Sequence, residues 1–213
     1  NYDFIEGIPF KKFGESTLLE NAIKSVQESN RISELIITSK SKKVLTFIKD
    51  LMDAGKIDNV IIHERKKDDH EIGNIRIKSF FEIAIQEFNS KHSENPDILI
   101  YLSLHAILRR SSHIDQALDL LKLSQSDSVV SVKHENEALF KYGSQGLEIM
   151  NPGRFRDLSF ERERIYRFNG AIIAVWTEIL KSESLLGSKI NFIEMTPDES
   201  LQINTPTLTK LLD

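Results

Sequence analysis

The chain of 213 residues contains no cysteine, one tryptophan and five prolines. The lack of cysteine excludes disulfides, thiolate zinc sites and a cysteine nucleophile, and it is compatible with a reducing compartment. No apolar run approaches the ~20 residues that span a bilayer, and the N-terminus has no signal-peptide pattern. These features predict a cytoplasmic protein that does not interact with a membrane.

An excess of positive charge is also lacking, since the net charge is −4. The most basic run, at residues 65–67, is followed at once by two aspartates that largely cancel it. We therefore expect no nucleic-acid partner. Hydrophobic residues make up 40% of the chain, which is ordinary for a globular protein with a buried core.

Short apolar, β-branched runs alternate with amphipathic segments along the sequence. This alternation is typical of an α/β fold with a mainly parallel sheet flanked by helices. A polar stretch at residues 135–164 interrupts it, so we predict a single domain over residues 1–213 with an inserted excursion. The expected strands are 2–5, 34–39, 59–63, 97–102, 127–132 and 170–175, and the expected helices are 16–29, 42–54, 79–88 and 112–121.

Four segments carry a recognisable set of motifs. Residues 102–109 read Leu-Ser-Leu-His-Ala-Ile-Leu-Arg, and residues 127–132 read Asp-Ser-Val-Val-Ser-Val. Residues 166–172 read Tyr-Arg-Phe-Asn-Gly-Ala-Ile, and the stretch 195–205 begins with Met-Thr-Pro and ends with Gln-Ile-Asn-Thr. In order and spacing these segments resemble the cytidylyltransferases that make CMP-activated acidic sugars, the CMP-N-acetylneuraminate synthetase group.

The resemblance implies a Rossmann-like nucleotidyltransferase fold and a defined reaction. The anomeric hydroxyl of an acidic, nonulosonic sugar would attack the α-phosphate of CTP, giving a CMP-sugar and pyrophosphate. It also implies magnesium as the cofactor and CTP and the sugar as partners. A homodimer formed through the excursion is a further expectation from the family.

The N-terminal segment resembles only half of the family's phosphate loop. Gly7-Ile8-Pro9-Phe10-Lys11 fits the second half, whereas the arginine, serine and lysine of the first half are not found before it. Either the protein lacks that half of the loop, or that half lies outside these 213 residues. The resemblance implies that Gly7 and Lys11 bind the nucleotide and that Lys11 is the catalytic cation. The alternative is that Lys11 belongs to an exposed lysine pair before a helix.

Further site residues follow from the same resemblance. Arg109 would bind the nucleotide, or it would instead cap the exit of the preceding strand. Tyr166, Asn169 and Gly170 would bind the sugar, although the Asn-Gly pair could equally serve only to start a strand. Ser103 and His105 replace a glutamine and a threonine of the family, and a serine cannot reach as far as the glutamine.

The sharpest departure lies at Gln202 and Asn204, two amides on alternate residues of an extended segment. By resemblance they occupy the positions of the two aspartates that hold magnesium. An amide keeps the carbonyl oxygen and loses the charge that magnesium prefers. Three interpretations stay open. The chain could be an active cytidylyltransferase, or a catalytically silent homologue that keeps the fold to bind a nucleotide, a sugar or a partner. It could also be an α/β domain whose resemblance is inherited and whose ligand is unrelated.

Overall fold

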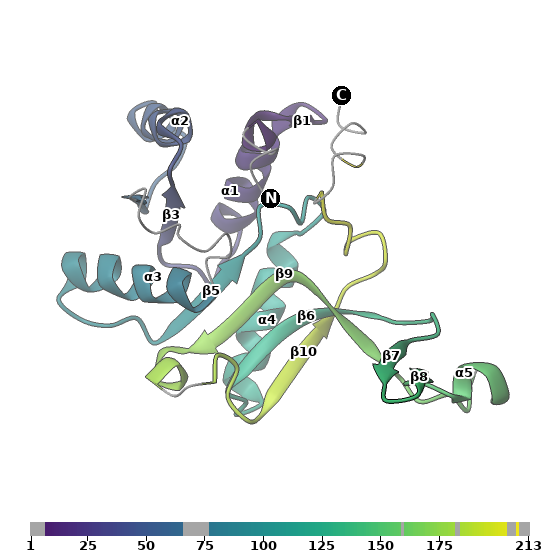
Figure 1. Ribbon diagram of the computed structural model, residues 1–213. Coiled ribbons are helices and arrows are strands. Elements are labelled where there is room, and N and C mark those ends of the chain that lie inside the picture. The colour runs from purple at the N-terminus through teal and green to yellow at the C-terminus, as the bar shows by residue number, and fades with distance from the viewer. Residues whose placement is uncertain (1–6, 66–76, 159, 182–183, 204–207, 209–213) are drawn as a thin grey trace.

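The computed structural model describes residues 7–65, 77–158, 160–181, 184–203 and 208 (Figure 1). The strand expected at residues 2–5 and the expected metal ligand Asn204 lie outside these residues. The helices and strands are, in chain order, η2 (Ile8–Phe10), β1 (Lys12–Phe13), β2 (Ser16–Thr17), α1 (Leu18–Gln27), β3 (Leu35–Ser39), α2 (Lys42–Asp53), β4 (Val60–Glu64), α3 (Ile77–His92), β5 (Ile98–Leu102), α4 (Ser111–Leu123), β6 (Ser128–His134), β7 (Phe140–Gly143), β8 (Gly146–Ile149), α5 (Gly153–Arg156), β9 (Tyr166–Trp176), η4 (Thr177–Lys181) and β10 (Ile190–Glu194).

Four strands form the central sheet in the order β10-β6-β9-β5. β6 and β10 run parallel, whereas β9 lies antiparallel to both of its neighbours, β6 and β5. A parallel pair of β3 and β4 forms a second sheet. The expected α/β class with flanking helices is confirmed, and the central sheet is mixed because β9 reverses the chain direction after the excursion.

The two faces of the central sheet are buried by different helices. Ile172 and Ala174 of β9 pack in one core with Ile114 and Leu118 of α4. The intervening Ile173 and Val175 belong to a second core that contains Phe81 of α3, because successive side chains of a strand point to opposite faces. Figure 1 shows α4 running along one face of this sheet. β9 is therefore covered on both sides, as its continuous apolar run requires.

α1 and α2 pack against β3 and β4 in a separate core. α1 begins at Leu18 and is capped by Thr17, whose Oγ1 accepts a hydrogen bond from the amide of Glu20 at 3.2 Å. The Glu20 carboxylate accepts in return from the Thr17 amide at 2.8 Å, which completes a capping box. The helix predicted from residue 16 thus starts two residues later.

β10, α3 and the start of β9, at Tyr166 instead of residue 170, also differ from the sequence prediction. β10 was not predicted, because Ile190–Glu194 is short and carries polar residues among its apolar ones. α3 extends to His92, beyond the predicted end at residue 88, because the turn that follows it is polar and its apolar positions stop early.

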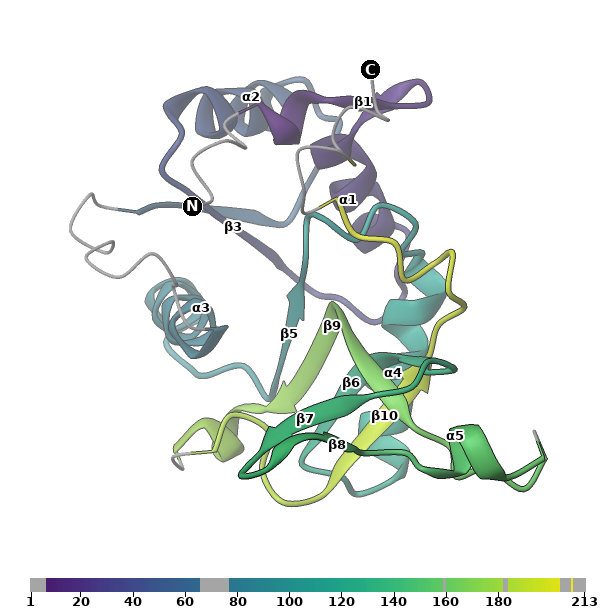
Figure 2. The same ribbon diagram turned by 45° about the vertical axis from the view of Figure 1, so that its right-hand side comes forward.

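The excursion, residues 135–164, forms an arm that contains β7, β8 and α5. β7 and β8 pair as an antiparallel hairpin across Gly143 and Gly146. In Figure 1 the arm projects to the side of the central sheet, and in Figures 1 and 2 it lies away from α1 and α2. Large apolar side chains remain exposed along the arm: Phe140, Tyr142, Leu147, Met150, Phe155, Leu158 and Phe160.

The two sheets do not join into one within the described residues. A cavity of about 850 Å³ lies where β3 and β5 approach each other, and its wall includes all five residues of each strand. Across the described part of the chain, no helix has both the length and the apolar character needed to cross a membrane.

Candidate functional site

The N-terminal segment is fixed beside the loop that follows β5. Ile8 is 2% exposed and forms a small core with Leu18 and Ile203, against which Leu104 packs. This core brings three distant parts of the chain together: η2, the loop after β5 and the C-terminal segment. Because sheet ends collect ligand-binding loops in open α/β folds, this region is the candidate site.

A short backbone ladder joins the loop after β5 to the C-terminal segment. Ala106 and Gln202 form an antiparallel bridge, and the Ile203 amide donates to the His105 carbonyl at 3.0 Å. The Nδ1–H of His105 donates to the Ile203 carbonyl at 2.8 Å. Burial lowers the pKa of His105, so the ring is held neutral with its proton on Nδ1. His105 therefore ties the two loops together.

Arg109 is a buried cation, with 7% of its surface exposed. Its Nη1 donates to the Ser103 carbonyl at 2.6 Å and to the Ala171 carbonyl at 3.4 Å. Burial lowers the pKa of Arg109 to about 10. Its Nε has no hydrogen-bond partner among the described residues. Arg109 thus bonds the backbone just after β5 and in β9, and its Nε is an unused donor within the described residues.

Asn169 uses its amide within the protein. Its Oδ1 accepts from the Ser131 hydroxyl at 2.5 Å and from the Ala171 amide at 3.1 Å. Its Nδ2 donates to the Ser200 hydroxyl at 2.9 Å and to the Met195 sulfur at 3.3 Å. The side chain therefore connects β6, β9 and the turn after β10, and its donors and acceptor are engaged.

Gln202 lies directly over Gly170. Its Nε2 donates to the Asn169 carbonyl oxygen, and the same nitrogen would come within 2.7 Å of a Cβ added at Gly170. Gly170 has a φ of +73°, a conformation that other residues adopt at a cost. The positive φ therefore favours glycine here, whereas the Gln202 amide, at the end of a flexible side chain, could move aside for a Cβ.

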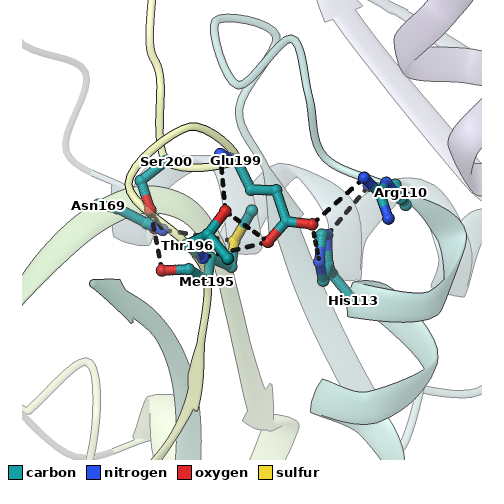
Figure 3. A network of polar contacts seen from close by, with 7 residues as sticks. All are labelled: Arg110, His113, Asn169, Met195, Thr196, Glu199 and Ser200. Atoms are coloured by element: carbon teal, nitrogen blue, oxygen red, sulfur yellow. Dashed lines mark hydrogen bonds and ion pairs between the residues drawn. The ribbon is translucent and has the colours of Figure 1, made fainter. Parts of the chain in front are cut away.

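A polar network fixes the turn that carries Gln202 (Figure 3). Glu199 accepts from the amide and hydroxyl of Thr196 at 3.1 and 3.0 Å, and its other oxygen lies 3.4 Å from Arg110 and 3.5 Å from His113. The hydrogen bond from the Thr196 amide is the main reason that the pKa of Glu199 is lowered. The network ties the turn after β10 to the start of α4.

The predicted site residues fall into two places. The first place is the small core that contains Ile8, where several chain segments meet. Five predicted residues lie on these segments, although no single cluster contains all of them: Lys11, Arg109, Asn169, Gly170 and Gln202. Gly7 is exposed, with a φ of −96° and open space around its Cα, so the backbone itself does not demand a glycine there.

Tyr166 lies in the second place. Its ring packs against Phe192 of β10 at 4.5 Å and against His134 of β6 at 5.8 Å between ring centroids. This position is at the other end of the exposed part of β9, where the arm leaves the sheet. The predicted sugar-binding set is therefore divided between Tyr166 and the Asn169–Gly170 pair.

Several residues that shape the site were not anticipated: Ser131, Arg110, His113, Met195, Thr196, Glu199 and Ser200. The spacing of Thr196 and Glu199 was an available signal, because Ser/Thr followed three residues later by an acid is a capping-box pattern. The other contacts join residues far apart in the sequence and left no local pattern.

The residues present do not fit a magnesium site of the kind that the resemblance implies. The side chain of Gln202 is neutral and donates its nitrogen to a backbone carbonyl, whereas magnesium is usually held by carboxylates. Within the described residues, no group of three or more acidic or histidine side chains is placed to hold a metal ion. Asn204, the other predicted ligand, lies outside these residues.

No family model and no curated protein matches the sequence. Solved structures share the fold at low identity. The chain is similar to a 4-diphosphocytidyl-2C-methyl-D-erythritol synthase from Anaerococcus prevotii DSM 20548, with a TM-score of 0.67 and 14% identity over 96% of this chain and 88% of that one.

Two further structures are similar at the same level. A CMP:2-keto-3-deoxy-manno-octonic acid synthetase in complex with CTP has a TM-score of 0.61 and 14% identity, covering 97% of this chain and 90% of that one. A 2-C-methyl-D-erythritol 4-phosphate cytidylyltransferase from Thermus thermophilus has a TM-score of 0.56 and 11% identity, covering 96% and 91%. The chain therefore has the fold of these cytidylyltransferases.

Proposed function

We propose that this chain is a cytidylyltransferase that transfers CMP from CTP to an acidic, nonulosonic sugar. The oxygen of the anomeric hydroxyl forms a bond to the α-phosphorus, the bond from this phosphorus to the bridging oxygen breaks, and pyrophosphate leaves. The hydroxyl proton is lost to solvent. The fold shared with three cytidylyltransferases supports the transfer, and the motif resemblance supports the class of sugar.

The observation that carries the proposal is the meeting of the motif segments around one small core. Ile8 and Ile203 belong to this core, and the loop after β5 is bonded to the C-terminal segment through His105. Segments separated by almost the whole chain are thus brought to one sheet end. Phosphoryl transfer depends mainly on such positioning and on nearby positive charge.

The proposed role of Lys11 is to stabilise the charge that develops on the leaving pyrophosphate. Lys11 follows η2, and its backbone is held by the bond from its amide to the Ile8 carbonyl and by the bond from the Leu18 amide to its own carbonyl. A cation on a fixed backbone loses little entropy when the triphosphate binds. Arg109, which is already bonded to two carbonyls, would position the loop after β5.

The test is release of pyrophosphate from CTP with a panel of nonulosonic acids, in the presence of magnesium or manganese. We expect turnover with CTP and little with ATP, GTP or UTP. Lys11→Met is expected to lower kcat about 100-fold, in the range seen when one charge-stabilising donor is removed. Lys12→Met, at the exposed neighbouring position, is the matched control and should leave kcat within about twofold.

The contacts of Gln202 favour a second function, which is binding without catalysis. Because its nitrogen is bonded to the Asn169 carbonyl and its side chain covers Gly170, a catalytically silent homologue would retain this arrangement for binding alone. Calorimetry with CTP separates the two. Binding without pyrophosphate release under any of the sugar conditions would favour the silent homologue and contradict the transferase.

The arm supports a homodimer as part of the same proposal. Tyr142 is 86% exposed and Phe160 is 80% exposed, and the other large apolar side chains of the arm are exposed as well. Monomeric proteins rarely leave an apolar surface of this kind in water. A second copy of the chain would bury the arm in an interface of ordinary size, about 1,200–2,000 Å² in total.

The double variant Tyr142→Asp/Phe155→Asp is expected to halve the mass measured by light scattering, because two charges would enter the apolar interface. The control is Leu123→Asp, since Leu123 is 82% exposed at the end of α4 and outside the arm. Dimers that persist in the double variant, or a monomeric parent protein, would contradict the role of the arm.

A further inference from the structure

The turn after β10, residues 196–200, is closed on itself by Glu199. The Glu199 amide donates to the Thr196 hydroxyl at 3.2 Å, and its Oε2 accepts from the Thr196 amide at 3.1 Å. The Ser200 amide donates to the Thr196 carbonyl at 2.9 Å. The other carboxylate oxygen of Glu199, Oε1, is directed at the start of α4 (Figure 3).

His113 joins this carboxylate to the first turn of α4. Its Nε2 lies 3.5 Å from Oε1 of Glu199, and its Nδ1 accepts a hydrogen bond from the Arg110 amide at 3.1 Å. Because Nδ1 is an acceptor, the proton of the neutral ring is on Nε2, which faces Glu199. One imidazole therefore caps α4 and contacts the turn after β10 at the same time.

A second proton on His113 is incompatible with this arrangement. An imidazolium has two donors and no acceptor, so the Arg110 amide would lose its partner. The charged groups that face the ring are Glu199, from the turn after β10, and Arg109 and Arg110, from the loop before α4. His113 is only 7% exposed, and burial is the main reason that its pKa is lowered. The attraction of Glu199 does not offset this burial together with the repulsion of two arginines.

The turn leads directly to Gln202. Two residues after Ser200, the Gln202 nitrogen bonds the Asn169 carbonyl, and the same nitrogen lies over Gly170. Within the described residues, the polar contacts between the turn and the start of α4 all end on the Glu199 carboxylate. The placement of Gln202 over Gly170 therefore depends on Glu199 on one side and on Asn169 on the other.

We propose that His113 is a proton-sensitive positioning residue for the segment that carries Gln202. As a neutral imidazole it holds residues 196–200 against α4, and when it is protonated the turn separates from α4. Since burial lowers the pKa of His113, acid favours the separated state, in which the ring meets water. The effect begins as the pH falls below about 6.5, the ordinary value for histidine. Glu199, whose pKa is lowered, stays ionised in this range. The inference concerns conformation and does not depend on the proposed reaction.

The test is amide hydrogen exchange of the full chain at pH 7.5 and 5.5, with the rate of each amide divided by its unstructured rate at the same pH. Two amides report the change: that of Arg110, bonded to His113, and that of Ile203, bonded to the His105 carbonyl. We expect the protection of both to fall by about threefold to elevenfold at pH 5.5. The upper value is the limit that a histidine with a pKa of about 6.5 in the separated state sets at this pH.

The matched variant is His113→Gln. A glutamine at the third helical position also completes a capping box, and its amide can donate to Glu199, but it does not titrate. It should keep the protection at pH 7.5 and remove most of the loss at pH 5.5. His92→Gln, at a histidine of α3 that contacts Glu34, should respond to pH as the parent protein does.

His105 is also buried and contacts Ile203, so the loss is measured as the difference between the parent protein and His113→Gln. An equal loss in His113→Gln, or a loss at the Arg110 amide without one at Ile203, would overturn the proposal. Lower protection of His113→Gln by the same factor at both pH values would also overturn it, since His113 would then have only a structural role. A nuclear magnetic resonance titration of the His113 ring in the parent protein needs no variant. A pKa at or above 6.5, or a proton on Nδ1 at pH 7.5, would contradict the proposal.

Discussion

Replacing Asn169 by leucine is expected to lower the free energy of unfolding by about 3 kcal/mol. Leucine has a similar size but cannot form the buried hydrogen bonds that the asparagine amide makes. The Ala171 amide and the Ser200 hydroxyl would lose the partners that they have in the folded protein. Ser131, with no exposed surface, would keep only its bonds to the backbone of Ile172. Denaturant unfolding monitored by the fluorescence of Trp176 measures the change.

Two further variants show which hydrogen bonds account for the loss of stability in Asn169→Leu. Asn169→Asp keeps the acceptor that bonds Ser131 and Ala171 but removes the donor to Ser200, so we expect a loss of about 1 kcal/mol. Asn89→Leu, at an exposed amide that donates to the Asn95 side chain, should change stability by less than about 0.5 kcal/mol. If Asn169→Leu is as stable as the parent protein and only weakens sugar binding, Asn169 acts on the ligand rather than on the fold.

The sequence was sufficient for elements whose pattern is local. The helical spacing of Ile114, Ala117, Leu118 and Leu121 predicted α4, and all four residues are buried in the core. The apolar run before residue 103 predicted β5 in the same way. These predictions succeeded because a helix or strand that buries one face must repeat apolar residues at a fixed period.

The direction of β9 and the polar contacts of the site could not be predicted from the period of apolar residues. β9 runs antiparallel after an arm of about thirty residues, and a long connection leaves either direction open. Asn169 bonds Ser131 and Ser200, which are 38 and 31 positions away. The motif resemblance located Asn169, but only the folded chain reveals that its amide is engaged by neighbours on other strands.

For Gln202, too, the folded chain shows a contact of the amide that the sequence does not predict. From the sequence its amide is a ligand without charge, whereas in the structure it is also a donor to the Asn169 carbonyl. An aspartate at this position could neither donate that bond nor reach as far. The absence of a carboxylate is therefore coupled to the local packing over Gly170. Replacing Gln202 by aspartate changes both the charge at this position and that packing.

The double variant Gln202→Asp/Asn204→Asp is expected to raise the affinity for Mn²⁺, used as a probe for Mg²⁺, at least 100-fold. Each added carboxylate attracts a divalent cation at short range by an amount on the order of several kcal/mol. In the absence of metal the same variant should be less stable than the parent by about 1–2 kcal/mol, because the bond to the Asn169 carbonyl is lost. Electron paramagnetic resonance titration measures the binding, and thermal unfolding with and without Mn²⁺ measures the linkage.

Gln202→Asn/Asn204→Gln is the matched control, since it changes the length of both side chains and adds no charge. It should bind Mn²⁺ as weakly as the parent protein. Equal affinities in the charged and neutral variants would mean that positions 202 and 204 do not form a metal pair. If the charged variant binds Mn²⁺ and also releases pyrophosphate faster than the parent protein, the two amides limit a cation site in an otherwise competent transferase. If it binds Mn²⁺ and still fails to turn over CTP, the silent homologue is favoured, because metal alone cannot position the leaving group.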